Sequence, residues 1–236
     1  MVHAALRRVG EVIGGADSVL WALRDAVGPG GTVLAYTDWE GGFDAEARPH
    51  DPDVPAFDPL ASRAIRENGW FPEMLRTTPG ARRSANPGAS VAAIGGRADW
   101  FTADHALDYG YGPQSPLARL VAADGKVLML GAPLDTMTLL HHAEHLADVA
   151  PKPVRRHAAP ILLDGATVWR HFEEFDTADP LPGLADDCFA AIVEAFLATG
   201  RGRRGNVGAA PSVIVAARDI VPFAVDWIER ALRSAS

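Results

Sequence analysis

Residues 16–37, which read ADSVLWALRDAVGPGGTVLAYT, decide the fold class. Apolar residues recur at helical spacing in the first half, which predicts a helix over Ala16 to Val27 that ends at Gly28-Pro29-Gly30-Gly31. Thr32 to Thr37 is a β-branched and apolar run that is typical of a strand. Because another short apolar segment, Val2 to Leu6, precedes the helix, the chain begins strand, helix, strand, the order of a layered α/β domain.

The rest of the chain continues this alternation. Further helices are predicted over Leu60 to Leu75, Pro116 to Ala122, Thr138 to Ala150, Cys188 to Ala198 and Ile220 to Leu232. Further strands are predicted over Ser90 to Ile94, Lys126 to Leu130, Ala159 to Leu163, Thr167 to Phe172 and Ser212 to Ala216. The turn Asp164-Gly165 indicates that two of these strands form a hairpin. We expect a single α/β domain over residues 1–236, with three α/β/α layers, a mixed sheet and inserted acidic loops.

The composition of the chain limits its partners. Hydrophobic residues make up 48 % of the 236 residues, and no apolar run approaches the length that crosses a bilayer. The first residues lack the pattern of a signal peptide, so we expect a cytoplasmic protein without a membrane partner. Since Cys188 is the only cysteine, the chain has no intrachain disulfide and no thiolate-rich metal cluster. The net charge of −8, from 22 basic and 30 acidic residues, disfavours nucleic acid and favours a cationic ligand.

Two stretches concentrate the negative charge. Residues 38–60 contain seven acids against one basic residue, Arg48, and residues 173–187 contain six acids and no lysine or arginine. These acids are Asp38, Glu40, Asp44, Glu46, Asp51, Asp53 and Asp58, followed by Glu173, Glu174, Asp176, Asp179, Asp186 and Asp187. Prolines and glycines interrupt the first stretch, which is typical of a long loop. We expect both stretches to attract a polycationic ligand.

Three histidines lie close to a carboxylate in the segment Leu140-His141-His142-Ala143-Glu144-His145. The spacing His141-x-x-Glu144-His145 matches an inverted zinc-protease pattern, in which two imidazoles on one helix bind the metal, although the sequence marks no third ligand. Alternatively, His141 is a general base, and a nearby carboxylate fixes its tautomer. Glu174 and Asp176 are candidates for that carboxylate, or they belong only to a solvated acidic turn.

Two backbone segments could bind a phosphate. Gly110-x-Gly112-Pro113-x-Ser115-Pro116 leads into a predicted helix with Ser115 as its cap, and the N–H groups at a helix start suit an anion. His3-Ala4-Ala5, at a predicted strand end, could do the same. Neither segment has the spacing of a Walker loop or of a dinucleotide fingerprint, so ordinary turns are the alternative. Cys188 follows two acids that would raise the pKa of its thiol, and we therefore do not expect a nucleophile there.

Six short motifs, in order along nearly the whole chain, resemble those of one family. They are Val2-His3-Ala4-Ala5-Leu6, Gly28-Pro29-Gly30-Gly31-Thr32, Pro79-Gly80-Ala81-Arg82-Arg83-Ser84-Ala85-Asn86-Pro87, Gly112-Pro113-Gln114-Ser115-Pro116, Leu130-Gly131-Ala132-Pro133 and Thr138-Leu139-Leu140-His141-His142-Ala143-Glu144. The chain resembles the aminoglycoside 3-N-acetyltransferases, an antibiotic N-acetyltransferase family unrelated to the GNAT fold. Ala5 and Asn86 depart from the serine and histidine of the family motifs, and we expect the domain to lack the family's N-terminal helix.

The resemblance implies transfer of an acetyl group from acetyl-CoA to an amine of an aminoglycoside, without a metal. It implies that His141 is the base, that Glu174 or Asp176 orients it, and that backbone N–H groups near Thr138 stabilise the oxyanion. It also implies that the coenzyme contacts His3, Ala4, Ala5, Leu6, Arg83, Ser84, Gly112 and Ser115.

The resemblance also implies a substrate and its contacts. The aminoglycoside would contact Trp39, Glu40, Asp58 and Glu144, and acetylation of the 3-amine of its deoxystreptamine ring would confer antibiotic resistance. The family is compatible with a homodimer. Three other hypotheses stay open: an acetyltransferase for another amine, a metal-dependent hydrolase that uses His141, Glu144 and His145, and a protein that binds cationic drugs without turning them over.

Overall fold

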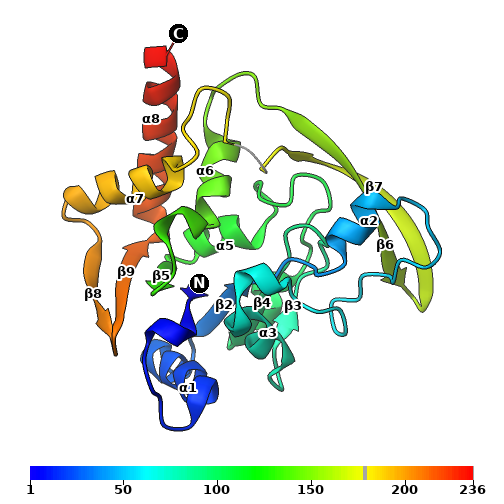
Figure 1. Ribbon diagram of the computed structural model, residues 1–236, viewed down its shortest axis with the longest axis horizontal. Helices are drawn as coiled ribbons and strands as arrows, with labels where there is room; N and C mark the ends of the chain where they lie inside the picture. Colours follow the sequence, from blue (N-terminus) through cyan, green and yellow to red (C-terminus); the bar gives the residue numbers. More distant parts are fainter. Residues whose placement is uncertain (178–179, 236) are drawn as a thin grey trace. The chain divides into compact units, whose positions relative to one another are not determined.

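The computed structural model describes residues 1–177 and 180–235, which form two compact units (Figure 1). The first unit contains Met1–Gly10, Tyr111–Val154 and Phe175–Ser236, and the second contains Glu11–Gly110 and Arg155–Glu174. No helix among the described residues is long and apolar enough to cross a membrane. The sequence predicts a single domain over residues 1–236, and this stays a prediction.

A four-stranded mixed sheet organises the first unit, with the strand order β1-β5-β9-β8. β1 (Val2–Ala4) runs parallel to β5 (Lys126–Leu130), and His3 lies opposite Met129. β9 (Ala210–Ala216) pairs antiparallel with β5, and the edge strand β8 (Arg203–Val207) pairs antiparallel with β9. The buried side chains of β5 and β9 come mainly from valine, methionine and leucine, whose burial stabilises the sheet.

Helices pack around the C-terminal part of this unit. The α-helices are α5 (Pro116–Ala122), α6 (Leu139–Leu146), α7 (Cys188–Ala198) and α8 (Ala217–Ala235), and the short 3₁₀ turns are η1 (Leu6–Arg8) and η3 (Leu134–Thr136). The long α8, red in Figure 1, contacts α5, α6, α7 and β9. It does so through an apolar stripe of Ile220, Ala224 and Ile228, spaced four residues apart.

The second unit contains an antiparallel sheet of order β2-β4-β3. Its strands are β2 (Thr32–Tyr36), β4 (Val91–Gly95) and β3 (Arg82–Arg83), and its helices are α1 (Gly15–Val27), α2 (Gly42–Ala47), η2 (Arg66–Asn68), α3 (Trp70–Thr77) and α4 (Ala98–Thr102). A two-stranded hairpin, β6 (Val154–Leu163) and β7 (Ala166–Phe175), carries buried Ala159 and Phe172 into a hydrophobic cluster with Trp39 and Phe57. The loop over residues 38–60, which contains α2, is therefore anchored by apolar packing.

The predicted mixed α/β class is confirmed, and some predicted elements are wrong in extent. The predicted helix over Leu60 to Leu75 begins only at Trp70, because Gly69 (φ 81°, ψ −171°) lies outside the helical region. The predicted helix over Thr138 to Ala150 ends at Leu146, since Ala147 is extended (φ −61°, ψ 133°). The sequence did not predict β8, because its residues do not alternate between apolar and polar. It forms a strand through its antiparallel backbone pairing with β9.

Candidate active site

Helix α6 brings His141 and Glu144 together. The two residues are three positions apart, so they share a helix face, and Nδ1 of His141 lies 2.8 Å from Oε2 of Glu144. The side chains are 22 % and 10 % exposed, so the pair is largely shielded from water. Because a carboxylate only accepts hydrogen bonds, Nδ1 carries a proton, and in the neutral form of this imidazole the lone pair is on Nε2.

Two aromatic rings hold the imidazole of His141 in place. The ring centroid of Tyr111 lies 5.0 Å from that of His141, and Phe189 of α7 packs edge-on at 4.9 Å. Tyr111 is itself anchored, because Nδ1 of buried His142 donates a 2.8 Å hydrogen bond to its carbonyl oxygen. Burial lowers the pKa of His142, which keeps this second imidazole neutral. Sequence reasoning missed Tyr111 and Phe189; the only signal for Tyr111 was its place in the glycine-rich segment.

The histidines of the zinc pattern do not converge on a metal site. The ring of His145 lies 4.5 Å from the ring of Phe175, whereas His141 is bound to Glu144. Over residues 1–177 and 180–235, no group of three or more His, Cys, Asp or Glu side chains is arranged to hold a metal ion. The arrangement gives the zinc hypothesis no support.

Thr138 is the N-cap residue of α6, and its carbonyl accepts a 3.1 Å hydrogen bond from the backbone N–H of His141. The N–H of Leu140, also in the first turn, donates to the carbonyl of Met137 over 2.9 Å. The N–H groups of Thr138 and Leu139, at the very start of α6, are therefore the candidate donors for an oxyanion.

In the first unit, the residues predicted to contact the coenzyme lie at β1 and before α5. Ala5 donates its N–H to Leu130 over 2.9 Å, so this N–H belongs to the sheet. Ser115 caps α5 as predicted, accepting a 3.1 Å hydrogen bond from the N–H of Ala118, and its own N–H is bound to the carbonyl of Gly112. Nε2 of His3 is buried without a hydrogen-bond partner among the described residues.

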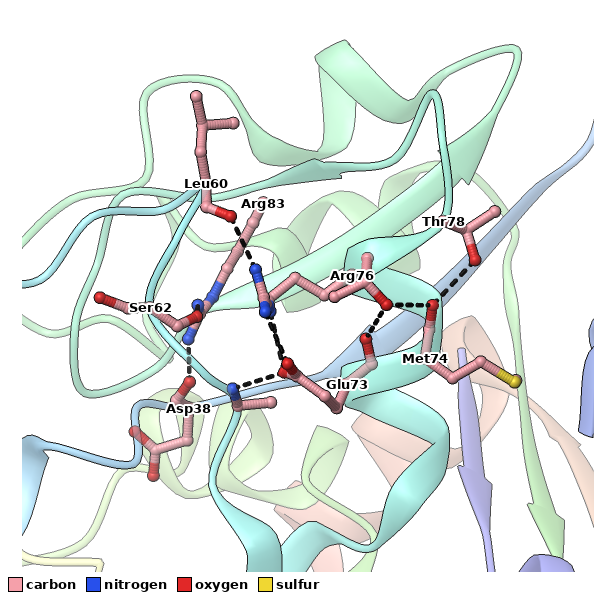
Figure 2. A network of polar contacts seen from close by, with 10 residues as sticks. Asp38, Leu60, Ser62, Glu73, Met74, Arg76, Thr78 and Arg83 are labelled. Carbon is pink, nitrogen blue, oxygen red and sulfur yellow. Dashed lines mark hydrogen bonds and ion pairs between the residues drawn. The ribbon is translucent and has the colours of Figure 1, made fainter.

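In the second unit, Arg83 holds loops together. Its guanidinium donates from Nε to Ser90 Oγ over 3.0 Å. The two other nitrogens donate to the carbonyls of Ser62 and Asp38 (Figure 2). Burial lowers the pKa of Arg83 to about 10, so it remains charged at neutral pH. The predicted contacts of Arg83 and Ser84 with the coenzyme stay predictions, since the structure shows Arg83 fixing the start and end of the acidic loop over residues 38–60.

A second arginine anchors the same loop to α3. Arg76 forms a two-pronged bond with Glu73, at 2.9 Å from Nε and 2.6 Å from Nη2, and donates to the carbonyl of Leu60 over 2.7 Å (Figure 2). Glu73 also accepts a 2.9 Å hydrogen bond from the N–H of Ala64. Burial alone would raise the pKa of Glu73, but the bonds from Arg76 and Ala64 outweigh it and keep the pKa below its usual value.

The residues predicted to contact the substrate already have internal partners in the second unit. Trp39 is 4 % exposed and packs edge-on against Phe57 at 5.6 Å, as a core residue. Glu40 pairs with Arg66 over 3.0 Å, and Asp58 accepts a 2.8 Å hydrogen bond from the N–H of Leu60. The structure thus gives Trp39 a packing role, and the substrate contacts of these residues stay predictions.

The acids predicted to orient His141 lie in different units. Glu174 is buried on β7 in the second unit, whereas Asp176, in the first, donates its N–H to the carbonyl of Pro153 over 2.8 Å. Asp179 of the same acidic stretch lies outside the described residues. Glu144, which the sequence assigned to the substrate, is the carboxylate bound to the imidazole.

Asp38 has an unusual environment that sequence reasoning missed. Its backbone is left-handed (φ 50°), and Oδ1 accepts a 2.7 Å hydrogen bond from the N–H of Trp39. Burial raises the pKa of Asp38 to about 7, against the opposing effects of Trp39, Tyr36 and Arg83. Tertiary packing produces this shift, and the sequence gives no signal of it.

Relatives of the chain cover nearly all of it. A family model described as aminoglycoside 3-N-acetyltransferase matches residues 1–229. An aminoglycoside N(3)-acetyltransferase III of Pseudomonas aeruginosa is 49 % identical, over 97 % of this chain and 86 % of the relative. An aminoglycoside N(3)-acetyltransferase VII of Streptomyces paromomycinus is 46 % identical, over 98 % of this chain and 85 % of the relative.

Solved structures that are similar to this chain indicate the same family as the sequence relatives. AAC-IIIb in a binary complex with CoASH is 60 % identical, with a TM-score of 0.92 over 98 % of this chain and 89 % of that one. AAC-VIa bound to sisomicin is 38 % identical, with a TM-score of 0.91 over 98 % of this chain and 90 % of that one. From the motifs, the fold and these relatives together, the chain belongs to the aminoglycoside 3-N-acetyltransferase family.

Proposed function

We propose that this chain transfers the acetyl group of acetyl-CoA directly to the 3-amine of the deoxystreptamine ring of an aminoglycoside, with His141 as general base. The observation that carries the proposal is the 2.8 Å bond between Glu144 Oε2 and His141 Nδ1. Family membership supplies the reaction class. Complexes of relatives with CoASH and with sisomicin support the choice of donor and acceptor.

Glu144 prepares His141 for proton transfer. The carboxylate keeps the proton on Nδ1, so Nε2 is free to accept one, and it stabilises the imidazolium that forms. His141 takes a proton from the amine while the amine nitrogen bonds to the acetyl carbon. It then returns the proton to the sulfur as the carbon–sulfur bond breaks. General base catalysis of this kind contributes roughly 10² to 10⁴ in rate.

Acetyl-CoA, when bound, supplies an acyl carbon that its thioester activates for attack. We assign the stabilisation of the negative charge on the carbonyl oxygen to backbone N–H groups at Thr138 and Leu139, at the start of α6. These donors are fixed in position before the reaction, so they need no reorganisation during it.

The residues present fit the coenzyme. Nε2 of His3 is buried and has no partner among the described residues, and burial lowers the pKa of this imidazole to about 3, so it is neutral. A neutral imidazole nitrogen can exchange one hydrogen bond with the amide or hydroxyl groups of the pantetheine arm. His3 to Leu6, Gly112 and Ser115 would hold the coenzyme in the first unit.

The acidic loops would attract the substrate. An aminoglycoside is a polycation, and the net charge of −8 with the acids of residues 38–60 gives it a favourable long-range interaction. Glu40 and Asp58, in this loop, are the acids that we propose contact its ammonium groups. Trp39 would act indirectly, because its side chain packs in the hydrophobic cluster that holds the loop over residues 38–60 in place.

Thiol release from acetyl-CoA, followed over a panel of aminoglycosides, tests the proposal. We expect release only with compounds that carry a 3-amine, and a loss of about 10²-fold or more in kcat for His141→Ala. His171→Ala is the matched control, because it removes an exposed imidazole of the second unit. Equal release across the whole panel, or an active His141→Ala enzyme, would overturn the assignment. Loss of activity with a chelator and recovery with zinc would favour the hydrolase.

A further inference from the structure

A lysine of the first unit is anchored to α6, the helix that carries His141. Nζ of Lys152 donates a 3.0 Å hydrogen bond to the carbonyl oxygen of His145. His145 follows His141 by four positions, so the two residues lie on one face of α6, one turn apart. Their rings share a neighbour, since the ring centroid of Tyr111 lies 5.0 Å from that of His141 and 6.5 Å from that of His145. The chain therefore holds an amine of its own one helical turn from the candidate base.

The backbone around this lysine is restricted. Lys152 lies between Pro151, whose ring fixes its own φ, and Pro153, which restricts the residue before it. The carbonyl of Pro153 accepts a 2.8 Å hydrogen bond from the N–H of Asp176, which ties the segment to the chain that follows β7. The backbone at Lys152 is thus held on both sides, and its four-carbon side chain reaches back to α6.

The surroundings of Nζ combine an aromatic ring with nearby carboxylates. Nζ of Lys152 lies 5.2 Å from the ring centroid of Phe175. Partial burial lowers the pKa of Lys152, and its effect exceeds the opposing effects of three acids, which are Asp148, Glu144 and Glu229. A larger fraction of this amine is therefore neutral at neutral pH than of a lysine in water, and the neutral form is the nucleophile.

The chain contains a natural reference for this amine. Lys126 and Lys152 are its only lysines. Lys126 is the first residue of β5 and is exposed to solvent, whereas Lys152 is half-buried against α6. The two lysines therefore present one amine to the solvent and one amine to the surroundings of His141.

Acetyl-CoA, the co-substrate, supplies the electrophile. We propose that Lys152 is a site of self-acetylation, at which its Nζ attacks the acetyl carbon of bound acetyl-CoA. The nitrogen–carbon bond forms, the carbon–sulfur bond breaks, and the proton that the amine loses passes to the departing sulfur, which leaves CoASH and an uncharged acetyl-lysine. The inference rests on the proposed function in one respect, the position of the acetyl group beside His141. One helical turn is about 5.4 Å along the axis, a distance that the flexible side chain of a lysine can cover.

Peptide mass spectrometry after incubation with acetyl-CoA at neutral pH, without an aminoglycoside, tests the inference. We expect Lys152 to be acetylated about tenfold or more faster than Lys126, because a bound donor reacts with a neighbouring amine faster than a free donor does. An excess of CoASH should slow the acetylation of Lys152, since it competes for the coenzyme site, and should leave Lys126 unchanged. Lys152→Arg should remove the fast modification, and Lys126→Arg is the matched control that should retain it.

The outcomes separate the inference from the proposed function. Equal rates at the two lysines would overturn the inference, because they would indicate reaction with acetyl-CoA free in solution. Fast acetylation of Lys152 that excess CoASH does not slow would overturn it too, since the donor would not be the bound coenzyme. A chain that acetylates an aminoglycoside but not Lys152 would keep the proposed function and lose this site. A chain that acetylates Lys152 but no aminoglycoside would do the reverse.

Discussion

Oε2 of Glu144 lies 2.8 Å from Nδ1 of His141, and both side chains project from the same turn of α6. The relationship requires no contribution from the second unit. Tyr111 and Phe189, which pack on the imidazole, also belong to the first unit. The base and the groups that orient it are thus assembled within one part of the fold.

Replacing Glu144 should slow the reaction more than it weakens substrate binding. Glu144→Gln removes the negative charge that stabilises the imidazolium, so we expect kcat to fall at least about tenfold, with a smaller change in KM. Steady-state kinetics measure the two constants, and Glu11→Gln, at an exposed position, is the control. An unchanged kcat would contradict the role given to Glu144.

Asp38 should make the protein less stable as the pH rises through 7. Because burial raises its pKa to about 7, the folded state binds this proton more tightly than the unfolded chain does. The stabilisation is complete below pH 4, near the usual carboxyl pKa, and is lost as the pH rises through 7. Asn also accepts the left-handed backbone, so Asp38→Asn should stabilise the protein at pH 8, on the order of 2 kcal/mol, and much less at pH 5.

Thermal unfolding of Asp38→Asn at pH 5 and pH 8 measures this difference. Asp99→Asn, whose side chain is 83 % exposed, serves as the control and should show no such pH dependence. If Asp38→Asn changed the thermal stability equally at both pH values, the carboxyl of Asp38 would not titrate between them.

Removing Arg76 should destabilise the second unit. Its side chain is 7 % exposed and makes three hydrogen bonds to Glu73 and Leu60, so we expect Arg76→Ala to lower the free energy of unfolding by about 2 to 3 kcal/mol. Arg82→Ala, which removes an exposed arginine paired with Asp99, should cost at most about 1 kcal/mol. Urea unfolding compares the two, and equal losses would show that the Arg76 network does not anchor the loop.

Cys188 should be unreactive in the folded protein. Burial raises the pKa of its thiol to about 11, so little thiolate exists at neutral pH. We expect mass spectrometry to find no alkylation by iodoacetamide at pH 7.5, and full alkylation of the same protein in urea. An acetylated cysteine trapped after mixing with acetyl-CoA would contradict direct transfer.

Local signals predicted much of the fold. Helical spacing with a glycine stop gave the helix over Ala16 to Val27 within one residue, and Ser115 before Pro116 correctly marked the cap of α5. The Asp164-Gly165 turn likewise predicted the hairpin of β6 and β7. These features depend on neighbours in sequence, so the sequence carries them.

Features that depend on distant contacts escaped prediction. The predicted helix over Leu60 to Leu75 does not form before Trp70, because the carbonyl of Leu60 binds the guanidinium of Arg76 and Gly69 has a φ of 81°. The raised pKa of Asp38 results from packing of remote segments. The spacing of Glu144 and His141 placed them on one helix face, so their hydrogen bond could have been predicted. The sequence did not indicate which of the nearby acids would form that bond with the imidazole.

Because an imidazole and its carboxylate stand three positions apart on a single rigid element, that element alone sets the distance between them. A change in the length or sequence of the loop over residues 38–60, which belongs to the other unit, would leave this pair in place. The proton-accepting group is thus insulated from variation elsewhere in the chain.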